Sequence, residues 1–177
     1  MSKTVVPVAV LIPARDYGQY IREALESLAA QTVLPAEVLV IDDGSIDDSP
    51  QRIAEAIDAL PDLPLRVVRH ERPRGFVASL IEGTALTNAE LIAHVDADDR
   101  VLPRYLESLV EALDAHPNAG YAYPRVRLFG SETGVVLSGP FNAARLVYDG
   151  NYIPHIGIIR RSAYEATRGY RDLPSRA

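Results

Sequence analysis

The stretch "AELIAHVDADD", residues 89–99, joins an apolar run to three carboxylates within four positions. The run 89–95 has the composition of a short strand that is buried on both faces of a sheet. Like charges repel, so gathering Asp96, Asp98 and Asp99 at a strand end is unfavourable unless a cation neutralises them. The stretch therefore predicts a covered sheet with a charged site at its edge.

Similar apolar runs alternate with helical patterns through the first 115 residues of the chain. Strands are predicted at 8–12, 36–41, 65–70 and 89–95, and helices at 20–31, 49–60, 75–86 and 103–116. The last helix is expected to begin at Pro103, a residue favoured in the first turn. Strands that alternate with helices in this way predict an α/β fold, with a Rossmann-like, mainly parallel sheet flanked by helices.

The pattern changes after residue 117. Segments 119–130 and 133–139 predict a strand pair around the Gly130–Gly134 turn, and 140–155 predicts a loop rich in aromatic residues. Segment 156–167 predicts a short strand that runs into a short helix. We expect one domain over residues 1–177, with a small additional β region after residue 117.

Composition narrows the class of protein. The chain of 177 residues carries 18 Lys and Arg against 24 Asp and Glu, a net charge of −6, which argues against a nucleic-acid binder. It has no cysteine, so disulfides and thiolate metal sites are excluded. The N-terminal residues resemble no signal peptide, and no apolar run reaches the length of a spanning helix. A cytoplasmic location is therefore expected.

Three polar clusters follow predicted strands: "PARD" at 13–16, "DDGS" at 42–45 and "DADD" at 96–99. Ligands of parallel sheets bind outside the carboxyl ends of the strands, so these clusters are expected to share one crevice. Aspartate oxygens suit Mg²⁺ or Mn²⁺, and Mg²⁺ commonly joins protein carboxylates to phosphate oxygens. Taken singly, each cluster is also explained as a solvated loop or a helix cap. Their combination favours a site for a diphosphate and a divalent cation.

The combination of these segments is specific. "LESLAAQTVLPAEVLVIDDGSIDDS" (25–49), followed by "RPRGFVASLIEGTALTNAELIAHVDADDRVLPRYLESLVEALDAHP" (72–117), resembles the family 2 glycosyltransferases of the GT-A fold. The resemblance is close over residues 6–118 and looser over 155–170. It implies a nucleotide-sugar-binding half at 1–117 and a partial acceptor-side half at 118–177.

The resemblance also implies roles for single residues. Residues 13–16 would form the wall beside the nucleotide base, Asp43 would read the base, and residues 96–98 would lie at the diphosphate. Asp98 and Asp99 would hold Mg²⁺ or Mn²⁺, and His155 would lie on the acceptor side. The full set expected to bind the nucleotide-sugar is Pro13, Ala14, Arg15, Asp16, Asp42, Asp43, Arg74, Asp96, Ala97 and Asp98.

One departure from the family pattern concerns the helix after Gly75. The family often carries "ARN" there, whereas this chain has Leu80 and Ile81 in the matching places. Arg72 and Arg74, which precede the glycine, are the candidates to replace that basic residue at the diphosphate. A solvated basic loop is the equally weighted alternative.

A second departure concerns the general base. In the family, a segment like "RRSAYEATRGYRD" (160–172) usually continues into an acidic "ED" motif, whose carboxylate takes the acceptor's proton in inverting members. Glu165 and Asp172 lie nearby but outside that motif. The base is therefore expected beyond Ala177, and the chain is expected to be truncated at its C-terminal end.

The expected function is transfer of a sugar from a nucleotide-diphospho-sugar to an acceptor hydroxyl, with inversion and dependence on a metal. A UDP-linked donor is one candidate, and saccharide, lipid and protein acceptors stay open, as in cell-envelope polysaccharide biosynthesis. A missing C-terminal part would allow association with the inner face of the membrane. The alternatives are a non-catalytic nucleotide-sugar-binding or interaction domain and, ranked last, a nucleotidyltransferase. The latter would need a glycine-rich basic loop, which "PARDYGQY" (13–20) matches poorly.

Overall fold

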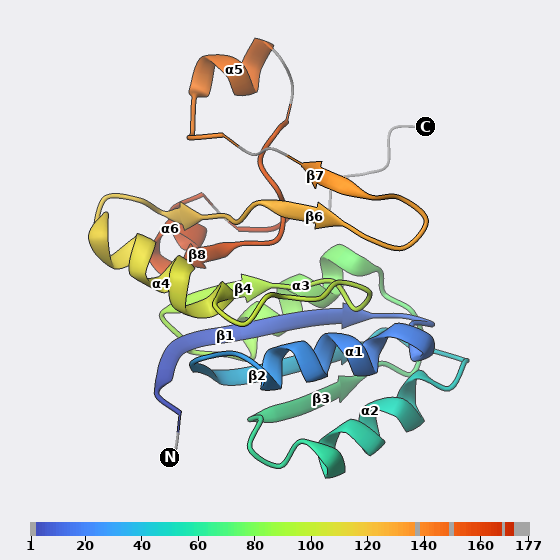
Figure 1. Cartoon of the computed structure of the whole chain (residues 1–177). Helices are drawn as coiled ribbons and strands as arrows, with labels where there is room; N and C mark the ends of the chain where they lie inside the picture. The colour runs from blue at the N-terminus through green and yellow to red at the C-terminus, as the bar shows by residue number, and fades with distance from the viewer. Residues whose placement is uncertain (1–2, 137–138, 149–150, 168, 172–177) are drawn as a thin grey trace.

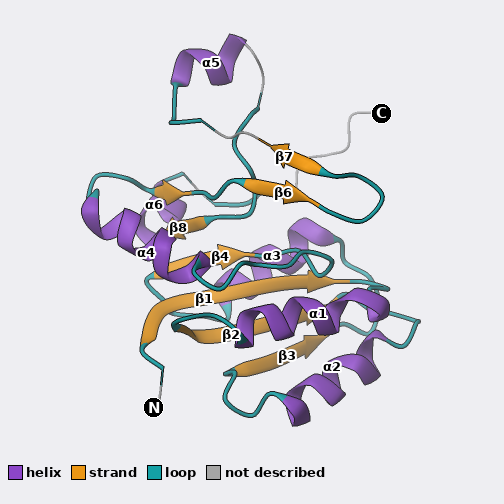
Figure 2. Cartoon of the chain, viewed as in Figure 1, coloured by secondary structure: helices purple, strands orange, loops and turns teal. Residues whose placement is uncertain are grey.

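The computed structural model describes residues 3–136, 139–148, 151–167 and 169–171. Helices and strands alternate through the first two thirds of the chain, as Figures 1 and 2 show. In chain order the elements are β1 (Val5–Ala14), α1 (Gly18–Ala29), β2 (Leu34–Asp42), α2 (Ser49–Ala59), β3 (Leu65–Arg69), α3 (Phe76–Ala85), β4 (Leu91–His94), α4 (Tyr105–Ala115), β5 (Tyr121–Ala122), β6 (Val126–Leu128), β7 (Gly134–Val136), α5 (Ala143–Tyr148), β8 (Ile158–Arg160) and α6 (Arg161–Ala166).

The central sheet has the strand order β3-β2-β1-β4-β8-β5. Strands β3, β2, β1 and β4 run parallel to their neighbours, whereas β8 runs antiparallel to both β4 and β5. The carboxyl ends of the parallel strands meet at one edge of the sheet, where the polar clusters follow. This arrangement confirms the predicted α/β fold with a mainly parallel sheet.

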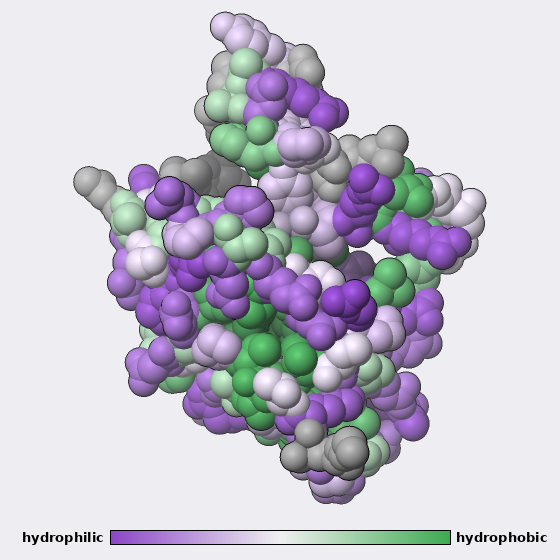
Figure 3. Space-filling view, turned by 60° about the vertical axis from the view of Figure 1, so that its left-hand side comes forward, coloured by the Kyte–Doolittle hydropathy of each residue, from purple (hydrophilic) through white to green (hydrophobic). Residues whose placement is uncertain are grey.

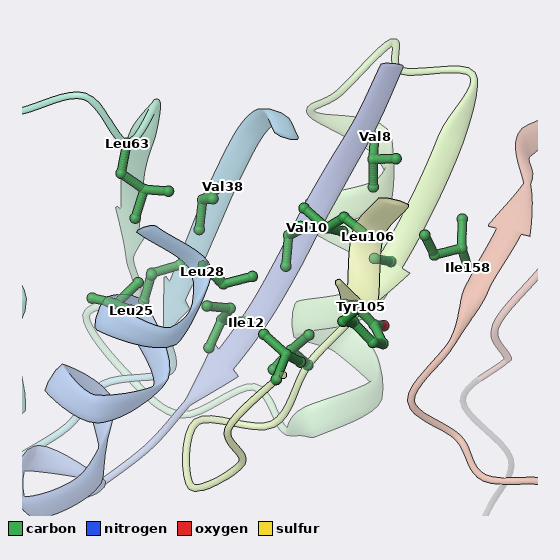
Figure 4. Close-up of a cluster of buried hydrophobic side chains, with 14 of the residues drawn as sticks. Val8, Val10, Ile12, Leu25, Leu28, Val38, Leu63, Tyr105, Leu106 and Ile158 are labelled. Atoms are coloured by element: carbon green, nitrogen blue, oxygen red, sulfur yellow. The ribbon is translucent and has the colours of Figure 1, made fainter. Parts of the chain in front are cut away.

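Alternate residues of β1 face two hydrophobic layers, because successive side chains of a strand point to opposite faces. Val8, Val10 and Ile12 are fully buried against α1, α2 and α4, as Figure 4 shows for several of their partners. Leu11 faces the other way and packs with Leu80 of α3, which lies behind the sheet in Figure 1. Helices therefore cover both faces of the sheet and hold the strand ends rigidly in place.

The second part of the chain adds the predicted hairpin. Strands β6 and β7 pair antiparallel, and in Figure 3 the segment that carries α5 projects above the main body of the molecule. The predicted strand at 119–130 is divided, however, because Tyr121 and Ala122 join the central sheet beside β8. Pro124 lies at the break, and a proline has no N–H to continue a ladder. Strand β8 followed by α6 confirms the strand-to-helix prediction for residues 156–167.

Two sequence predictions differ from the structure. The loop predicted at 140–155 contains helix α5, where Asn142 Oδ1 accepts a hydrogen bond of 3.0 Å from the N–H of Arg145. Helix α4 begins at Tyr105, because Pro103 is part of a preceding turn and its carbonyl accepts the N–H of Thr32 at 2.8 Å. Asp172 lies outside the described residues. None of the helices within the described ranges is long and apolar enough to cross a bilayer.

Candidate functional site

A cavity of about 430 Å³ opens at the carboxyl ends of β1, β2 and β4. It is lined by Pro13, Ala14, Arg15, Tyr17, Asp43, Gly75, Phe76, Ser79, Asp96, Ala97 and Asp98. All the residues predicted to bind the nucleotide-sugar line it except Asp16, Asp42 and Arg74. The structure thus brings the three polar clusters of the sequence to one crevice.

A larger cavity of about 940 Å³ lies between α4 and the β6–β7 hairpin. Its lining is mostly apolar, and Asp99 is the one carboxylate of the described residues that reaches it. Chemistry on a charged ligand needs the gathered carboxylates, which line the smaller cavity. We therefore assign the functional site to the smaller cavity, which Asp43, Asp96 and Asp98 all line.

Asp43 is a buried carboxylate at the end of β2, with 4% of its surface exposed. Its Oδ1 accepts hydrogen bonds from the Nδ1 of His70 and the N–H of Arg74, both at 2.7 Å, and its Oδ2 accepts the N–H of Gly75 at 2.8 Å. Burial by itself would raise the pKa of Asp43, but these hydrogen bonds outweigh it and lower the pKa. Asp43 is therefore ionised and rigidly oriented at neutral pH.

The neighbouring carboxylates Asp42 and Asp16 accept hydrogen bonds from backbone N–H groups of the loop that follows β2. Asp42 Oδ1 accepts the N–H of Ser45 at 2.9 Å, and its Oδ2 lies 3.2 Å from the Nε of Arg69, an ion pair without hydrogen-bond alignment. Asp16, at a φ of 59°, accepts the N–H of Ile46 at 2.8 Å. Neither residue is among those that line the cavity. Their hydrogen bonds instead hold the loops that follow β1 and β2 in position.

Arg74, the predicted replacement for the family's basic residue, contributes its backbone to the site. Its N–H bonds Asp43, whereas its guanidinium pairs with Glu82 of α3. The Nε2 of His70 lies 2.9 Å from the same Glu82 carboxylate. Arg74 is not among the residues that line the cavity.

Asp96 links the two parts of the chain. Its Oδ1 lies 2.9 Å from the Nε2 of buried His94, and its Oδ2 lies 2.6 Å from the Nε2 of His155. Burial favours a higher pKa for Asp96, but the contacts with the two histidines prevail and lower its pKa. His155, predicted on the acceptor side, therefore reaches the carboxylate cluster directly.

The carboxylate cluster also has the composition of a cation site. Atoms of Asp96, Asp99 and His155 that are able to bind a metal lie within 4.8 Å of one another. Burial, Asp96 and Asp98 together raise the pKa of Asp99, which means that the carboxylates repel one another. A divalent cation would relieve this repulsion, and two carboxylates with one imidazole form a donor set suited to Mn²⁺. The residues therefore fit such an ion.

Four residues of the cavity were missed by sequence reasoning: Tyr17, Gly75, Phe76 and Ser79. Tyr17 directly follows the "PARD" segment, and Asp98, burial and Asp96 raise the pKa of its hydroxyl. The other three belong to the start of α3, whose first turn faces the cavity. The sequence did predict a helix beginning at Gly75. Helical periodicity alone, however, does not show which turn of that helix faces the site.

Gln31 hydrogen-bonds the loop between the carboxylates at 96–99 and helix α4. Its side chain is fully buried, donates to the carbonyl of Leu102 at 2.8 Å and accepts the N–H of Leu106 at 3.0 Å.

Replacing Gln31 with leucine leaves the Leu106 N–H without this acceptor. We expect the free energy of unfolding to fall by about 2–3 kcal/mol in a urea titration. The exposed Gln51→Leu serves as control and should stay within about 0.5 kcal/mol; equal effects of the two variants would contradict the bracing role.

The sequence of the chain was compared with the profiles of known protein families. The sequence profile of glycosyl transferase family 2 matches residues 9–167. The chain belongs to this family. The carboxylates that line the cavity, from Asp43 to Asp98, all fall within the matched part of the family 2 domain.

Curated relatives of this family 2 domain are longer proteins. An uncharacterized glycosyltransferase of Nostoc, alr2836, is 29% identical over 113 residues, which is 64% of this chain and 34% of the relative. The putative glycosyltransferase EpsH of Bacillus subtilis is 36% identical over 58% of this chain and 29% of its own length. The chain therefore spans about a third of the length of these relatives.

Solved structures share the fold of the family 2 domain. The mannosyltransferase PcManGT from Pyrobaculum calidifontis, in complex with GDP-Man and Mn²⁺, has a TM-score of 0.70 and 20% identity, covering 93% of this chain and 47% of its own. TarS 1–349 of S. aureus, in complex with UDP-GlcNAc, has a TM-score of 0.68 and 22% identity, covering 93% and 48%. The likeness identifies the GT-A fold.

Proposed function

We propose that the chain is the donor-binding part of a glycosyltransferase that uses a nucleotide-diphospho-sugar. In this proposal the base lies beside Pro13, Ala14 and Arg15 and is oriented by Asp43, while the diphosphate lies at Asp96 and Asp98. The observation that carries the proposal is the cavity that Asp43 shares with Asp96 and Asp98, which follow β4. Its volume of about 430 Å³ lies within the range of ligand sites.

We further propose that the diphosphate is bound together with Mn²⁺ or Mg²⁺. Asp98 and Asp99 are the ligands predicted from the sequence. Among the described residues, the group whose ligand atoms lie within 4.8 Å of one another joins Asp99 to Asp96 and His155 and does not include Asp98, which lines the cavity beside it. When bound, such an ion stabilises the charge that develops on the departing diphosphate. The complexes of PcManGT with Mn²⁺ and of TarS with UDP-GlcNAc support a donor site of this kind on the shared fold.

The remaining steps are part of the same proposal. The sugar would pass to an acceptor hydroxyl in a single inverting displacement, in which a carboxylate acting as general base would take the proton. Residues 118–177 would contribute the acceptor side, with His155 as their contact to the carboxylates. ExoU, a succinoglycan biosynthesis protein of Rhizobium meliloti, is 38% identical over 58% of this chain and 29% of its own length, which supports a polysaccharide acceptor.

A calorimetric screen of nucleotide-sugars tests the donor site. We expect at least one nucleotide-diphospho-sugar to bind in the presence of Mn²⁺ and to bind more weakly when EDTA removes the metal, because Mn²⁺ offsets the repulsion between diphosphate and carboxylates. No binding of any nucleotide-sugar, with or without Mn²⁺, would contradict the proposal. A transfer assay with the bound donor then separates an enzyme from a non-catalytic binding domain.

A further inference from the structure

The hydrogen bonds of Asp43 leave its two oxygens unequal. A carboxylate has two oxygens with about four acceptor positions, two on each oxygen. Oδ1 already accepts from His70 and from the N–H of Arg74, whereas Oδ2 accepts from the N–H of Gly75. Among the described residues no other donor reaches Asp43, so a ligand finds one open acceptor position, on Oδ2.

His70 keeps Oδ1 occupied. The His70 side chain is 6% exposed, and its ring is held at both nitrogens, by Asp43 at Nδ1 (2.7 Å) and by Glu82 at Nε2 (2.9 Å). Both ring nitrogens therefore have a carboxylate as partner, one from the end of β2 and one from α3. Glu82 is itself paired with the guanidinium of Arg74. The ring therefore cannot turn away from Oδ1 without breaking its contacts at both nitrogens.

The loop on the other side of Asp43 is equally constrained. Gly75 has a φ of +98°, a conformation that residues with a Cβ rarely adopt, and it directs its N–H at Oδ2. A Cβ on Gly44 would lie 3.0 Å from the nitrogen of Pro73, so the loop before Gly75 packs closely on the turn after Asp43. The carboxylate is thus fixed from both sides in the orientation that leaves one acceptor open.

One open acceptor suits some bases and not others. Uracil and thymine present a single ring N–H on their pairing edge. Guanine presents a ring N–H beside an amino group, and these two parallel donors need both oxygens of one carboxylate. In this structure the second oxygen is filled by His70 and Arg74. A guanine would leave one donor unpaired in a buried position, which is unfavourable.

We infer that the site selects a uracil or thymine nucleotide over a guanine nucleotide, and that His70 is the specificity-determining residue because it fills Oδ1 of Asp43. The inference rests on the proposed donor site and names the class of its base. His70 acts through Asp43 and is thus a positioning residue. Glu82 supports it from α3, outside the cavity.

The test compares four nucleotides by calorimetry in Mn²⁺: UDP, dTDP, GDP and 3-methyl-UDP, which lacks the ring N–H. We expect dTDP to bind within a few-fold of UDP, and GDP and 3-methyl-UDP to bind about 10-fold more weakly or worse. GDP binding as tightly as UDP, or 3-methyl-UDP binding as tightly as UDP, would overturn the inference and leave the proposed donor site standing. No binding of any nucleotide would overturn both.

Two variants test the role of His70. His70→Phe keeps a ring in place but cannot bond Asp43, so Oδ1 gains an open acceptor position and the preference for UDP over GDP should fall from about 10-fold to about 2-fold. His70→Gln retains an N–H donor and should keep most of that preference. A residue that only supports the fold would weaken both nucleotides equally, so an unchanged preference in His70→Phe would refute its positioning role. If the variants do not fold, the four-nucleotide comparison on the unaltered chain still decides the base preference.

Discussion

Replacing Asp98 with alanine is expected to weaken the binding of UDP in Mn²⁺ by about 100-fold, or about 2.7 kcal/mol. Asp98 is an exposed carboxylate on the wall of the cavity, and its charge helps to raise the pKa of Asp99 beside it. Its proposed role is to hold the metal ion against the diphosphate. Without that carboxylate, the ion and the diphosphate would lose a shared contact.

The same substitution should act in the opposite direction when no metal is present. In EDTA the Asp98 carboxylate only repels a diphosphate, so Asp98→Ala should bind UDP as well as the unaltered chain or a few-fold better. Isothermal titration in both buffers measures this reversal. Asp114→Ala, which removes an exposed carboxylate of α4, is the matched control and should change neither affinity. A loss of affinity that is equal with and without Mn²⁺ would refute a metal-holding role.

Replacing Asp43 with alanine is expected to lower the free energy of unfolding by about 3 kcal/mol at pH 7. The substitution leaves His70 and the N–H groups of Arg74 and Gly75 without their acceptor, and the loss of one partner from a buried charged contact is strongly destabilising. Urea titrations of both proteins measure the difference. The exposed Asp58→Ala of α2 is the control, expected within about 0.5 kcal/mol of the unaltered chain.

The effect of Asp43→Ala should depend on pH in a defined direction. The folded-state pKa of Asp43 lies below its ordinary value of 3.8, so the ionised carboxylate is favoured by folding. Its contribution to stability is complete well above pH 3.8 and is lost as the pH falls through the folded-state pKa. The difference between the two proteins should therefore be constant from about pH 5 to pH 7 and shrink below about pH 4. A difference that grows in acid would contradict the assigned hydrogen bonds.

The positions of the carboxylates were predictable from the sequence, because strand ends in a parallel sheet converge. Asp43, Asp96 and Asp98 follow apolar runs directly, and each reaches the cavity as predicted. What those carboxylates bond was not predictable. His70 and Asp43 are 27 positions apart, and nothing in the local pattern indicates that the imidazole turns inward to meet the acid.

Other features depended on contacts that the local pattern does not contain. The side chain of Arg74 was predicted at the diphosphate, but Glu82, eight positions further along the chain, pairs with it on α3. The prediction of a loop over residues 140–155 was wrong for 143–148, which form α5. The Asn142 side chain accepts the N–H of Arg145 at the start of this helix, a capping contact that the composition of the segment does not reveal. Tyr121 and Ala122 entered the central sheet because β8, far along the chain, offered an edge to pair with.

The place of β8 in the sheet has a consequence for how the chain folds during synthesis. Strand β8 lies between β4 and β5 and is the last of the strands described, so β4 keeps an unpaired edge until residues 158–160 have been made. An open edge of this kind is a template for pairing with another chain. A nascent chain arrested before β8 should therefore aggregate more readily than one that includes it, and the late strand would complete the sheet and bring His155 to Asp96 at the same time.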